Sequence, residues 1–348
     1  MRKNSLTRRR SLAGLGSLAA PPLMADQPPS LIGEPPGRIA PLADLVNVLE
    51  FENMAARSLA PAVYESIAGG DRRFFDRITF RPRMMVPATQ LDLSLELFGD
   101  KMFAPVIAGP VARLQQYHAD GEAGMARGAS EAKAWMVVSG ESSQPLEKIV
   151  EASSTVLWYQ VLLDADPSAI RARIDRAVQA GCKAICITTS APHPAARRPA
   201  SWDLIDQLRK GLNVPVLLKG IMTPQEAETA VKRHIDGIVV SNYGGLLTPG
   251  MAPPMETLPS IADAAGGKAP ILIDGGFRRG SDIFKALAFG ATAVLVARPV
   301  VWGLAAYGAA GARQVLEMLQ TELARDMAQT GKPKLKDVDR SVVKLHQA

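Results

Sequence analysis

Short apolar runs alternate with longer segments of helical apolar spacing along most of the chain. Short runs predict buried strands, whereas apolar residues three and four positions apart predict amphipathic helices. Residues 270–300 show one repeat. An apolar run stops at Asp274, helical spacing extends from Ser281 to Gly290, and a second run ends before Arg298. The predicted strands span residues 105–108, 135–138, 157–161, 184–188, 216–218, 237–240, 271–273 and 293–296.

This alternation predicts an α/β fold with parallel strands and right-handed crossovers. Eight strand-helix units favour a closed TIM (β/α)8 barrel over an open doubly wound sheet. No Gly-x-Gly-x-x-Gly motif follows an early strand, which further disfavours a dinucleotide-binding fold. Residues 41–68 carry helical spacing that Gly69-Gly70 ends. We therefore predict a barrel domain over residues 41–342 with an N-terminal extension of two or three helices.

The first residues have the composition of an export signal. Residues 1–25 combine a charged start, a short, modestly apolar stretch and small residues, and residues 26–40 are a linker rich in Pro, Gly and Ser. The stretch from Thr7 to Leu12 resembles the twin-arginine signal, in which two arginines follow a Ser or Thr. We expect a periplasmic or otherwise exported protein, cleaved near Ala20 or Ala25. The alternative is a basic tail with no targeting role.

The charge and the cysteines exclude some functions. The chain of 348 residues has a net charge of +6, and five cations of the leader precede its first acidic residue. The remainder is therefore nearly neutral, so a nucleic-acid partner is not expected. No apolar stretch is long enough to span a membrane. Cys182 and Cys186 lie too far apart in an extended strand for a disulfide, so they are interpreted as packing residues.

Polar side chains gather where the predicted strands end. Active sites of this barrel fold form at the carboxyl ends of the strands, and the loops after the last two strands often bind phosphate. The sequence therefore predicts a binding site for a large, partly polar ligand. The residues at the eight ends are Pro110, Ser139, Gln160, Thr188, Lys219, Ser241, Asp274 and Arg298.

Several of these segments resemble one family. The stretches ITFRPRMM, VPVLLKGIMTPQEA, GIVVSN and IDGGFRRGSDIFKALAFGATAVLVARPVVWGLA are similar to those of FMN-dependent 2-hydroxy-acid oxidases and dehydrogenases, from about Ala43 to Val342. The resemblance implies an FMN cofactor, a small-molecule substrate oxidised at a CH–OH group, a separate electron acceptor and a homo-oligomer. A phosphate-binding isomerase barrel is an alternative, which Lys219 with Gln160 and Ser139 disfavours.

The resemblance assigns a complete set of cofactor residues. Lys219 matches the lysine beside N1 and the C2 carbonyl of the flavin, where it would stabilise the negative charge of the reduced ring. Arg278 and Arg298 match the arginines that hold the phosphate. Ala297 replaces a glycine of the family. The other matching positions are Pro110, Val111 and Ala112 along the ring, Ser139, Gln160, Thr188 and Ser241 near it, and Asp274, Gly275 and Gly276 at the ribityl chain and phosphate.

The residues that bind and activate the substrate in the family are replaced in this chain. Tyr243 stands where the family has its catalytic histidine and Leu246 where it has an arginine that binds the carboxylate. A phenol has an ordinary pKa of about 10 and is a poor base near neutral pH. The chain therefore indicates a changed substrate or lost turnover. Ser190 replaces the aspartate that orients the histidine, Ser66 and Leu162 replace two tyrosines, and Glu141 replaces a tryptophan.

Other side chains are candidates for the missing roles. His193 is either a substitute base or an exposed loop histidine, and Tyr243 either exchanges a proton with the substrate or fills the space of the histidine. Arg197 is the candidate substrate-binding arginine, and His118 is interpreted as structural. We expect an FMN-dependent oxidoreductase with an altered substrate. The alternative is a catalytically silent FMN-binding protein that relays electrons or binds a partner.

Overall fold

The computed structural model describes residues 38–83, 86, 90–189, 200–245 and 251–346. One compact unit, Ile39–Ala348, contains every described element. The predicted signal segment 1–25 lies outside the described residues, as does most of the predicted linker 26–40.

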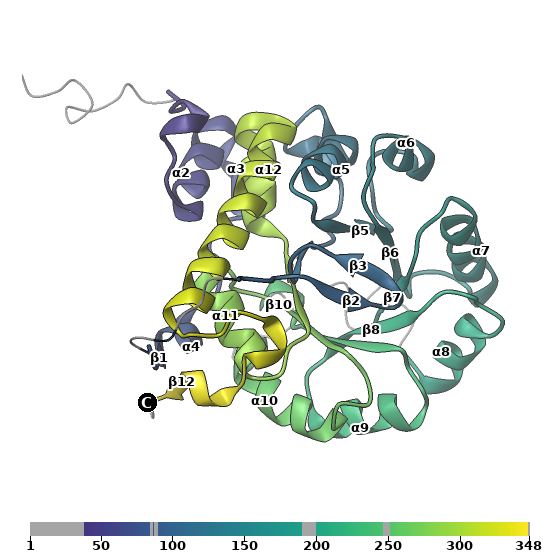
Figure 1. Cartoon of the computed structure of the whole chain (residues 1–348). Coiled ribbons are helices and arrows are strands. Elements are labelled where there is room, and N and C mark those ends of the chain that lie inside the picture. The colour runs from purple at the N-terminus through teal and green to yellow at the C-terminus, as the bar shows by residue number, and fades with distance from the viewer. Residues whose placement is uncertain (1–37, 84–85, 87–89, 190–199, 246–250, 347–348) are drawn as a thin grey trace, which may run out of the picture. The chain divides into compact units, whose positions relative to one another are not determined.

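Eight parallel strands form a closed barrel in which each strand pairs with two neighbours (Figure 1). The order around the barrel is β10-β11-β4-β5-β6-β7-β8-β9, so the sheet closes where β9 pairs with β10. The predicted barrel is therefore confirmed, with each strand within three residues of its predicted bounds. The strands are β4 (Val106–Ala108), β5 (Trp135–Ser139), β6 (Leu157–Leu162), β7 (Ile185–Thr188), β8 (Val216–Ile221), β9 (Gly237–Val240), β10 (Ile271–Asp274) and β11 (Ala293–Val296).

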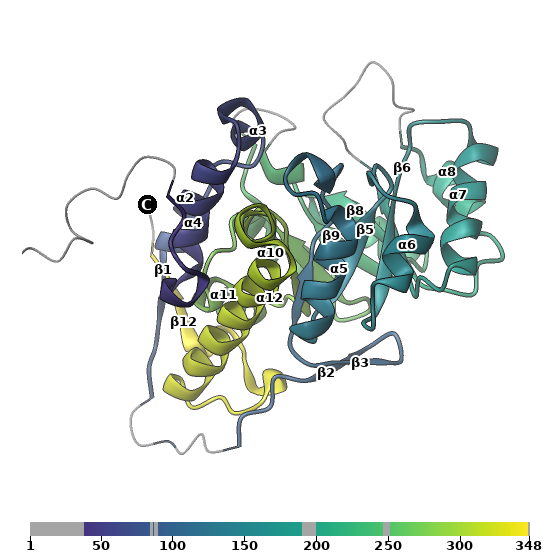
Figure 2. The ribbon, with the colours of Figure 1, turned by 90° about the horizontal axis from the view of Figure 1, so that it is seen from above.

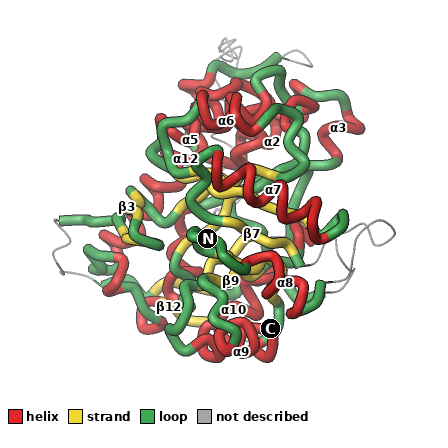
Figure 3. The backbone as a smooth tube through the Cα atoms, turned by 90° about the vertical axis from the view of Figure 1, so that its right-hand side faces the viewer, coloured by secondary structure: helices red, strands yellow, loops and turns green. Residues whose placement is uncertain are grey.

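Helices surround the yellow strands in Figure 3 and connect successive strands. Local signals fix several helix starts: Ser201 caps α8, and Thr223 forms a capping box with Glu226 in α9. The last helix breaks at Gly308, whose φ of 62° suits a residue without Cβ. The helices are α5 (Gly121–Glu131), α6 (Leu146–Glu151), α7 (Pro167–Gln179), α8 (Trp202–Arg209), α9 (Pro224–Lys232), α10 (Pro254–Ala265), α11 (Gly280–Ala288) and α12 (Arg298–Gln329).

The N-terminal extension packs against the last helix of the barrel. Helix α2 (Val48–Ser58) lies beside α12 in Figures 1 and 2, where the Phe51 ring meets the Tyr307 ring edge-on at 5.9 Å between centroids. The Trp302 indole of α12 donates a hydrogen bond to the Ile67 carbonyl, 2.9 Å away. The extension is thus anchored next to the carboxyl end of the barrel. It also contains η3 (Leu42–Asp44), α3 (Pro61–Glu65) and α4 (Arg73–Asp76).

Two short strand pairs were not predicted. Strands β1 (Ile78–Phe80) and β12 (Val343–Leu345) join the segment after α4 to the C-terminal segment in an antiparallel pair. Strands β2 (Leu95–Leu97) and β3 (Asp100–Met102) form a hairpin. Its apolar side chains pack with Trp135 and with Trp158, and Trp135 is the first residue of β5. The hairpin therefore covers the amino end of the barrel, opposite the predicted site.

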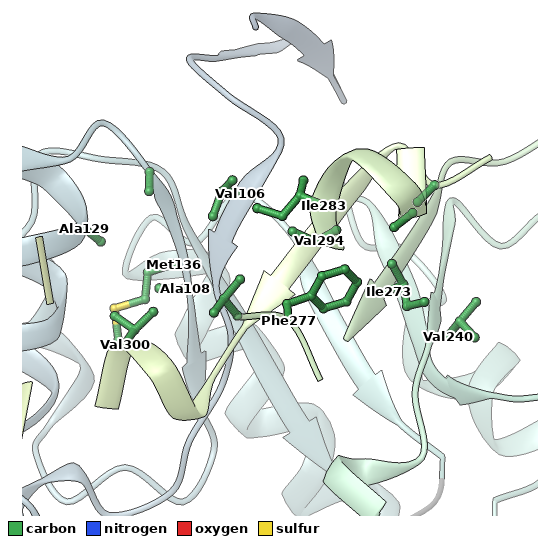
Figure 4. Close-up of a cluster of buried hydrophobic side chains, with 14 of the residues drawn as sticks. Val106, Ala108, Ala129, Met136, Val240, Ile273, Phe277, Ile283, Val294 and Val300 are labelled. Carbon is green, nitrogen blue, oxygen red and sulfur yellow. The ribbon is translucent and has the colours of Figure 1, made fainter. Parts of the chain in front are cut away.

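The core fills both the barrel and the layer between strands and helices. Figure 4 shows Val106, Val294, Ile273 and Val240 of neighbouring strands in one buried cluster with Phe277 and Ile283. Cys182 and Cys186 are free and buried, which confirms their packing role, and burial raises the pKa of each thiol to about 12. No helix in the described ranges is long and apolar enough to cross a membrane.

Candidate functional site

A cavity of about 280 Å³ lies at the carboxyl ends of the barrel strands. Most of the predicted site residues line it, although they come from distant parts of the chain. Segment 65–68 of the N-terminal extension forms one wall. Among the predicted residues, the cavity is lined by Pro110, Val111, Ala112, Ser139, Gln160, Lys219, Tyr243, Asp274, Gly275, Gly276, Arg278, Ala297 and Arg298.

Two predicted cofactor residues lie behind the cavity wall and position side chains that line it. Thr188 accepts a hydrogen bond from the Gln160 amide at 2.8 Å, and Ser241 accepts one from the Lys219 ammonium at 2.7 Å. Both hydroxyl groups are almost fully buried. Neither Thr188 nor Ser241 lines the cavity itself, and a cofactor contact for either residue stays a prediction. Gln160 and Lys219 lie within β6 and β8, before the last residues of these strands.

A buried ion pair lies at the centre of the cavity wall. The Lys219 ammonium is 2.7 Å from Asp274 Oδ2, and the two side chains are 5% and 14% exposed. The other oxygen, Asp274 Oδ1, is buried without a hydrogen-bond partner in the described structure. Because an unsatisfied buried acceptor is costly, this atom fits a ligand that donates a hydrogen bond, such as a polyol hydroxyl.

The turn after β10 depends on glycine. Gly275 and Gly276 have φ angles of 98° and 81°, which suit residues without a Cβ. A Cβ on Gly276 would lie 2.5 Å from the Asp71 carbonyl oxygen and 2.8 Å from the Phe75 ring. The glycines therefore allow the N-terminal extension to pack directly on the loop that carries Arg278.

Two arginines converge beside this turn. Arg278 is 3% exposed, stacks over the Trp302 ring at 4.4 Å, and donates to the Gly69 carbonyl at 2.6 Å. Burial, together with the charge of Arg298, lowers the pKa of Arg278 to about 9, and burial also lowers the pKa of Arg298. A Cβ on Gly70 would lie 2.8 Å from one guanidinium and 3.2 Å from the other. Two desolvated cations this close favour an anion between them, and phosphate suits their donors.

Two further residues hold this loop, and neither was predicted from the sequence. Asp282 accepts hydrogen bonds from the backbone amides of Arg278 and Arg279, both at 2.9 Å. Its carboxylate also pairs with Arg72 of the N-terminal extension at 2.7 Å. An acidic residue in the first turn of a helix is a capping signal, so Asp282 was detectable. Arg72 has no comparable local signal because its partner is far away in the sequence.

The same cavity contains two of the altered positions, Tyr243 and Ser66. Tyr243 has a φ of 56°, and its backbone amide donates to the Ser241 hydroxyl at 3.2 Å. The Lys219 ammonium lies 5.3 Å from the centre of the Tyr243 ring. Ser66 lines the cavity, and its hydroxyl oxygen is 2.9 Å from the Tyr117 hydroxyl, a contact that the sequence did not reveal.

The remaining candidate residues do not join the described site. Leu162 is buried away from the cavity, and Glu141 does not line it. His118 accepts a hydrogen bond from the Asp120 amide and contacts Gly308, an arrangement that agrees with a structural role. Four predicted positions lie outside the described residues: Ser190, His193, Arg197 and Leu246.

Comparison with known proteins shows the family of this chain. The family model described as FMN-dependent dehydrogenase matches residues 62–200 and 194–345. An L-lactate oxidase of Nostoc sp. is 34% identical over 86% of this chain and 98% of its own length. Glycolate oxidase of Spinacia oleracea is 30% identical over 86% and 95%. A mandelate oxidase structure with (S)-2-phenylpropionate superposes with a TM-score of 0.82 at 32% identity, covering 87% of this chain and 100% of the other. The chain therefore belongs to the FMN-dependent 2-hydroxy-acid oxidase and dehydrogenase family, and its cofactor is FMN.

Proposed function

We propose that this protein is an exported FMN-dependent oxidoreductase that oxidises a hydroxy acid or a related alcohol with substrate residues of its own. One observation carries the proposal. The cavity has a complete set of groups suited to FMN, whereas Tyr243 occupies the position that the family resemblance assigns to the catalytic histidine. A retained cofactor site beside an altered substrate position favours changed specificity.

The described residues suggest how FMN is held. Asp274 Oδ1 would accept a hydrogen bond from a ribityl hydroxyl, since that oxygen has no partner in the described structure. Arg278 and Arg298 would bind the phosphate. Lys219 would supply positive charge near the ring, fixed by Asp274 and Ser241. When bound, FMN supplies the capacity to accept two electrons from the substrate carbon.

A proton must also leave the substrate hydroxyl as the carbon is oxidised. Tyr243 is the candidate for this exchange within the described site, because its side chain lines the cavity beside Lys219. The nearby ammonium would offset negative charge that develops on an oxygen during the transfer. His193 is the second candidate base and Arg197 the candidate substrate-binding arginine.

Anaerobic reduction of the bound flavin tests this function. The purified protein is expected to contain FMN and to bleach when mixed with a member of a panel of hydroxy acids and alcohols. Tyr243→Phe should slow bleaching by at least about tenfold without changing FMN content. A protein that binds FMN but is bleached by no donor would instead support the silent FMN-binding alternative. A colourless protein that cannot be reconstituted would exclude both.

Export is a separate part of the proposal, and the twin-arginine-like segment supports it. Replacing Arg8 and Arg9 by lysine should leave the protein in the cytoplasm, while replacing Lys3 by arginine should not alter its location. Unchanged periplasmic protein in the double variant would refute the role of this segment. Light scattering of the exported protein tests the expected homo-oligomer.

A further inference from the structure

The cavity contains a phenol that the family resemblance does not assign. Tyr117 follows the short helix η4 (Leu114–Gln116), lines the cavity and is 7% exposed. Its hydroxyl oxygen is 2.9 Å from the Ser66 hydroxyl oxygen, across 51 residues of sequence. The family resemblance places a substrate-contacting tyrosine at the position of Ser66. Tyr117, from another element, places its phenol beside this position.

The direction of this hydrogen bond follows from the partners of Ser66. The Ser66 hydroxyl donates to the Val63 carbonyl at 2.7 Å. A serine hydroxyl has a single proton, so its bond to Tyr117 requires the phenol to be the donor. Once its proton is committed to Ser66, the Tyr117 oxygen can only accept further hydrogen bonds. It is therefore matched to a ligand group that donates, such as a hydroxyl or an amine, and poorly matched to a carboxylate.

The charges of the described cavity agree with this preference. Lys219 is neutralised by Asp274, and Arg278 and Arg298 converge beside Gly70 at the proposed phosphate end. Glu65 lines the cavity next to Ser66, and its side chain is exposed. The described lining beside Ser66 thus includes a carboxylate, and the Tyr117 oxygen adds a hydrogen-bond acceptor. Such surroundings favour an uncharged or cationic ligand over an anion.

We infer that Tyr117, oriented by Ser66, is a specificity-determining residue that selects an uncharged or cationic alcohol as the substrate. This inference rests on the proposed oxidation of a CH–OH donor and narrows its substrate class. Tyr117 is the residue that contacts the ligand. Ser66 is a positioning residue, because its hydroxyl oxygen accepts the hydrogen bond from the Tyr117 phenol.

Three compounds with the same carbon skeleton and hydroxyl position test the inference on the FMN-loaded protein. Lactate is anionic, lactamide is uncharged and 1-amino-2-propanol is cationic. The dissociation constant of each is measured from the change in flavin absorbance, and anaerobic bleaching is recorded separately. Lactamide and 1-amino-2-propanol should bind at least about tenfold more tightly than lactate.

The variants separate recognition from folding. Tyr117→Phe keeps the ring, so FMN content should not change, while affinity for lactamide and 1-amino-2-propanol should fall by about tenfold and that for lactate by less than about twofold. Ser66→Ala frees the phenol proton and should strengthen lactate binding. Tyr307→Phe removes a hydroxyl that donates to the Ala40 carbonyl, outside the cavity, and should change no affinity.

Each outcome decides the inference. Lactate binding most tightly, no binding by any of the three compounds, or equal losses for all three in Tyr117→Phe would overturn it. The expected order of affinities without bleaching would support recognition by Tyr117 and count against the proposed oxidation. Bleaching by lactate alone would support the oxidation and overturn the role of Tyr117.

Discussion

The ion pair between Lys219 and Asp274 allows a quantitative test of the site. The Lys219 side chain is 5% exposed in the parent, and Asp274→Ala leaves its ammonium with Ser241 as the remaining hydrogen-bond partner in the described structure. Breaking a buried pair from one side typically costs about 3–5 kcal/mol, because the remaining charge is uncompensated. We therefore expect Asp274→Ala to lower the free energy of unfolding of the cofactor-free protein by that amount. Lys219→Met should have a similar effect.

The double variant Lys219→Met with Asp274→Ala removes both charges. Replacing a whole buried pair by apolar groups is often nearly neutral, so its free energy of unfolding should recover to within about 1–2 kcal/mol of the parent. Asp263→Ala is the matched control. Its pair with Arg340 spans 2.6 Å, close to the 2.7 Å of the buried pair, but its two side chains are 64% and 49% exposed, and exposed pairs contribute at most about 1 kcal/mol.

Urea unfolding of the cofactor-free proteins, followed by circular dichroism, measures these differences. Bound FMN must be absent because its binding energy adds to the apparent stability. A double variant no more stable than the single variants would refute the reasoning, since uncompensated charge would not explain the loss. FMN titration supplies an independent readout. Asp274→Ala should weaken binding about ten- to a hundredfold, because a hydrogen bond to a charged acceptor contributes about 1.5–3 kcal/mol.

Three further predictions concern the phosphate end, the helix α12 carboxylates and the cysteines. Arg298→Gln should weaken FMN binding about ten- to a hundredfold in fluorescence titrations and leave riboflavin binding within about twofold, because riboflavin has no phosphate; equal losses would contradict a phosphate contact. Burial, with a smaller effect of Glu322, raises the pKa of Asp326 from 3.8 to about 6. The folded chain therefore binds the proton of the Asp326 carboxyl more tightly than the unfolded chain does. The protonated carboxyl favours folding at low pH, and this contribution to the free energy of unfolding is lost as the pH rises through 6. Asp326→Asn should therefore match the parent near pH 4 and exceed its urea midpoint at pH 7.5, and a constant difference would argue against titration of Asp326. Cys182 and Cys186 should react with a thiol reagent only in urea, because burial raises the pKa of both to about 12, so rapid labelling of the folded protein would be inconsistent with their burial.

The sequence was sufficient for the barrel and for much of the cofactor site. Apolar strands alternating with amphipathic helices are a local pattern, and a parallel sheet of eight such units closes in few ways. Polar residues at strand ends must then face the same end of the barrel. Lys219, Asp274 and Arg298 were identifiable for this reason and Arg278 from the family resemblance, and the structure brings all four to one cavity.

Only the tertiary structure revealed contacts between segments that are distant in the chain. Nothing near Arg72 indicates that it pairs with Asp282, and nothing near Tyr117 indicates that its hydroxyl meets Ser66. The burial of Thr188 and Ser241 behind the cavity wall likewise depends on packing between strands. Hydrophobic periodicity specifies which elements form because it is local. The partners of individual polar side chains are set by how those elements pack, so the direction of the Tyr117 hydrogen bond, and with it the proposed substrate class, required the folded molecule.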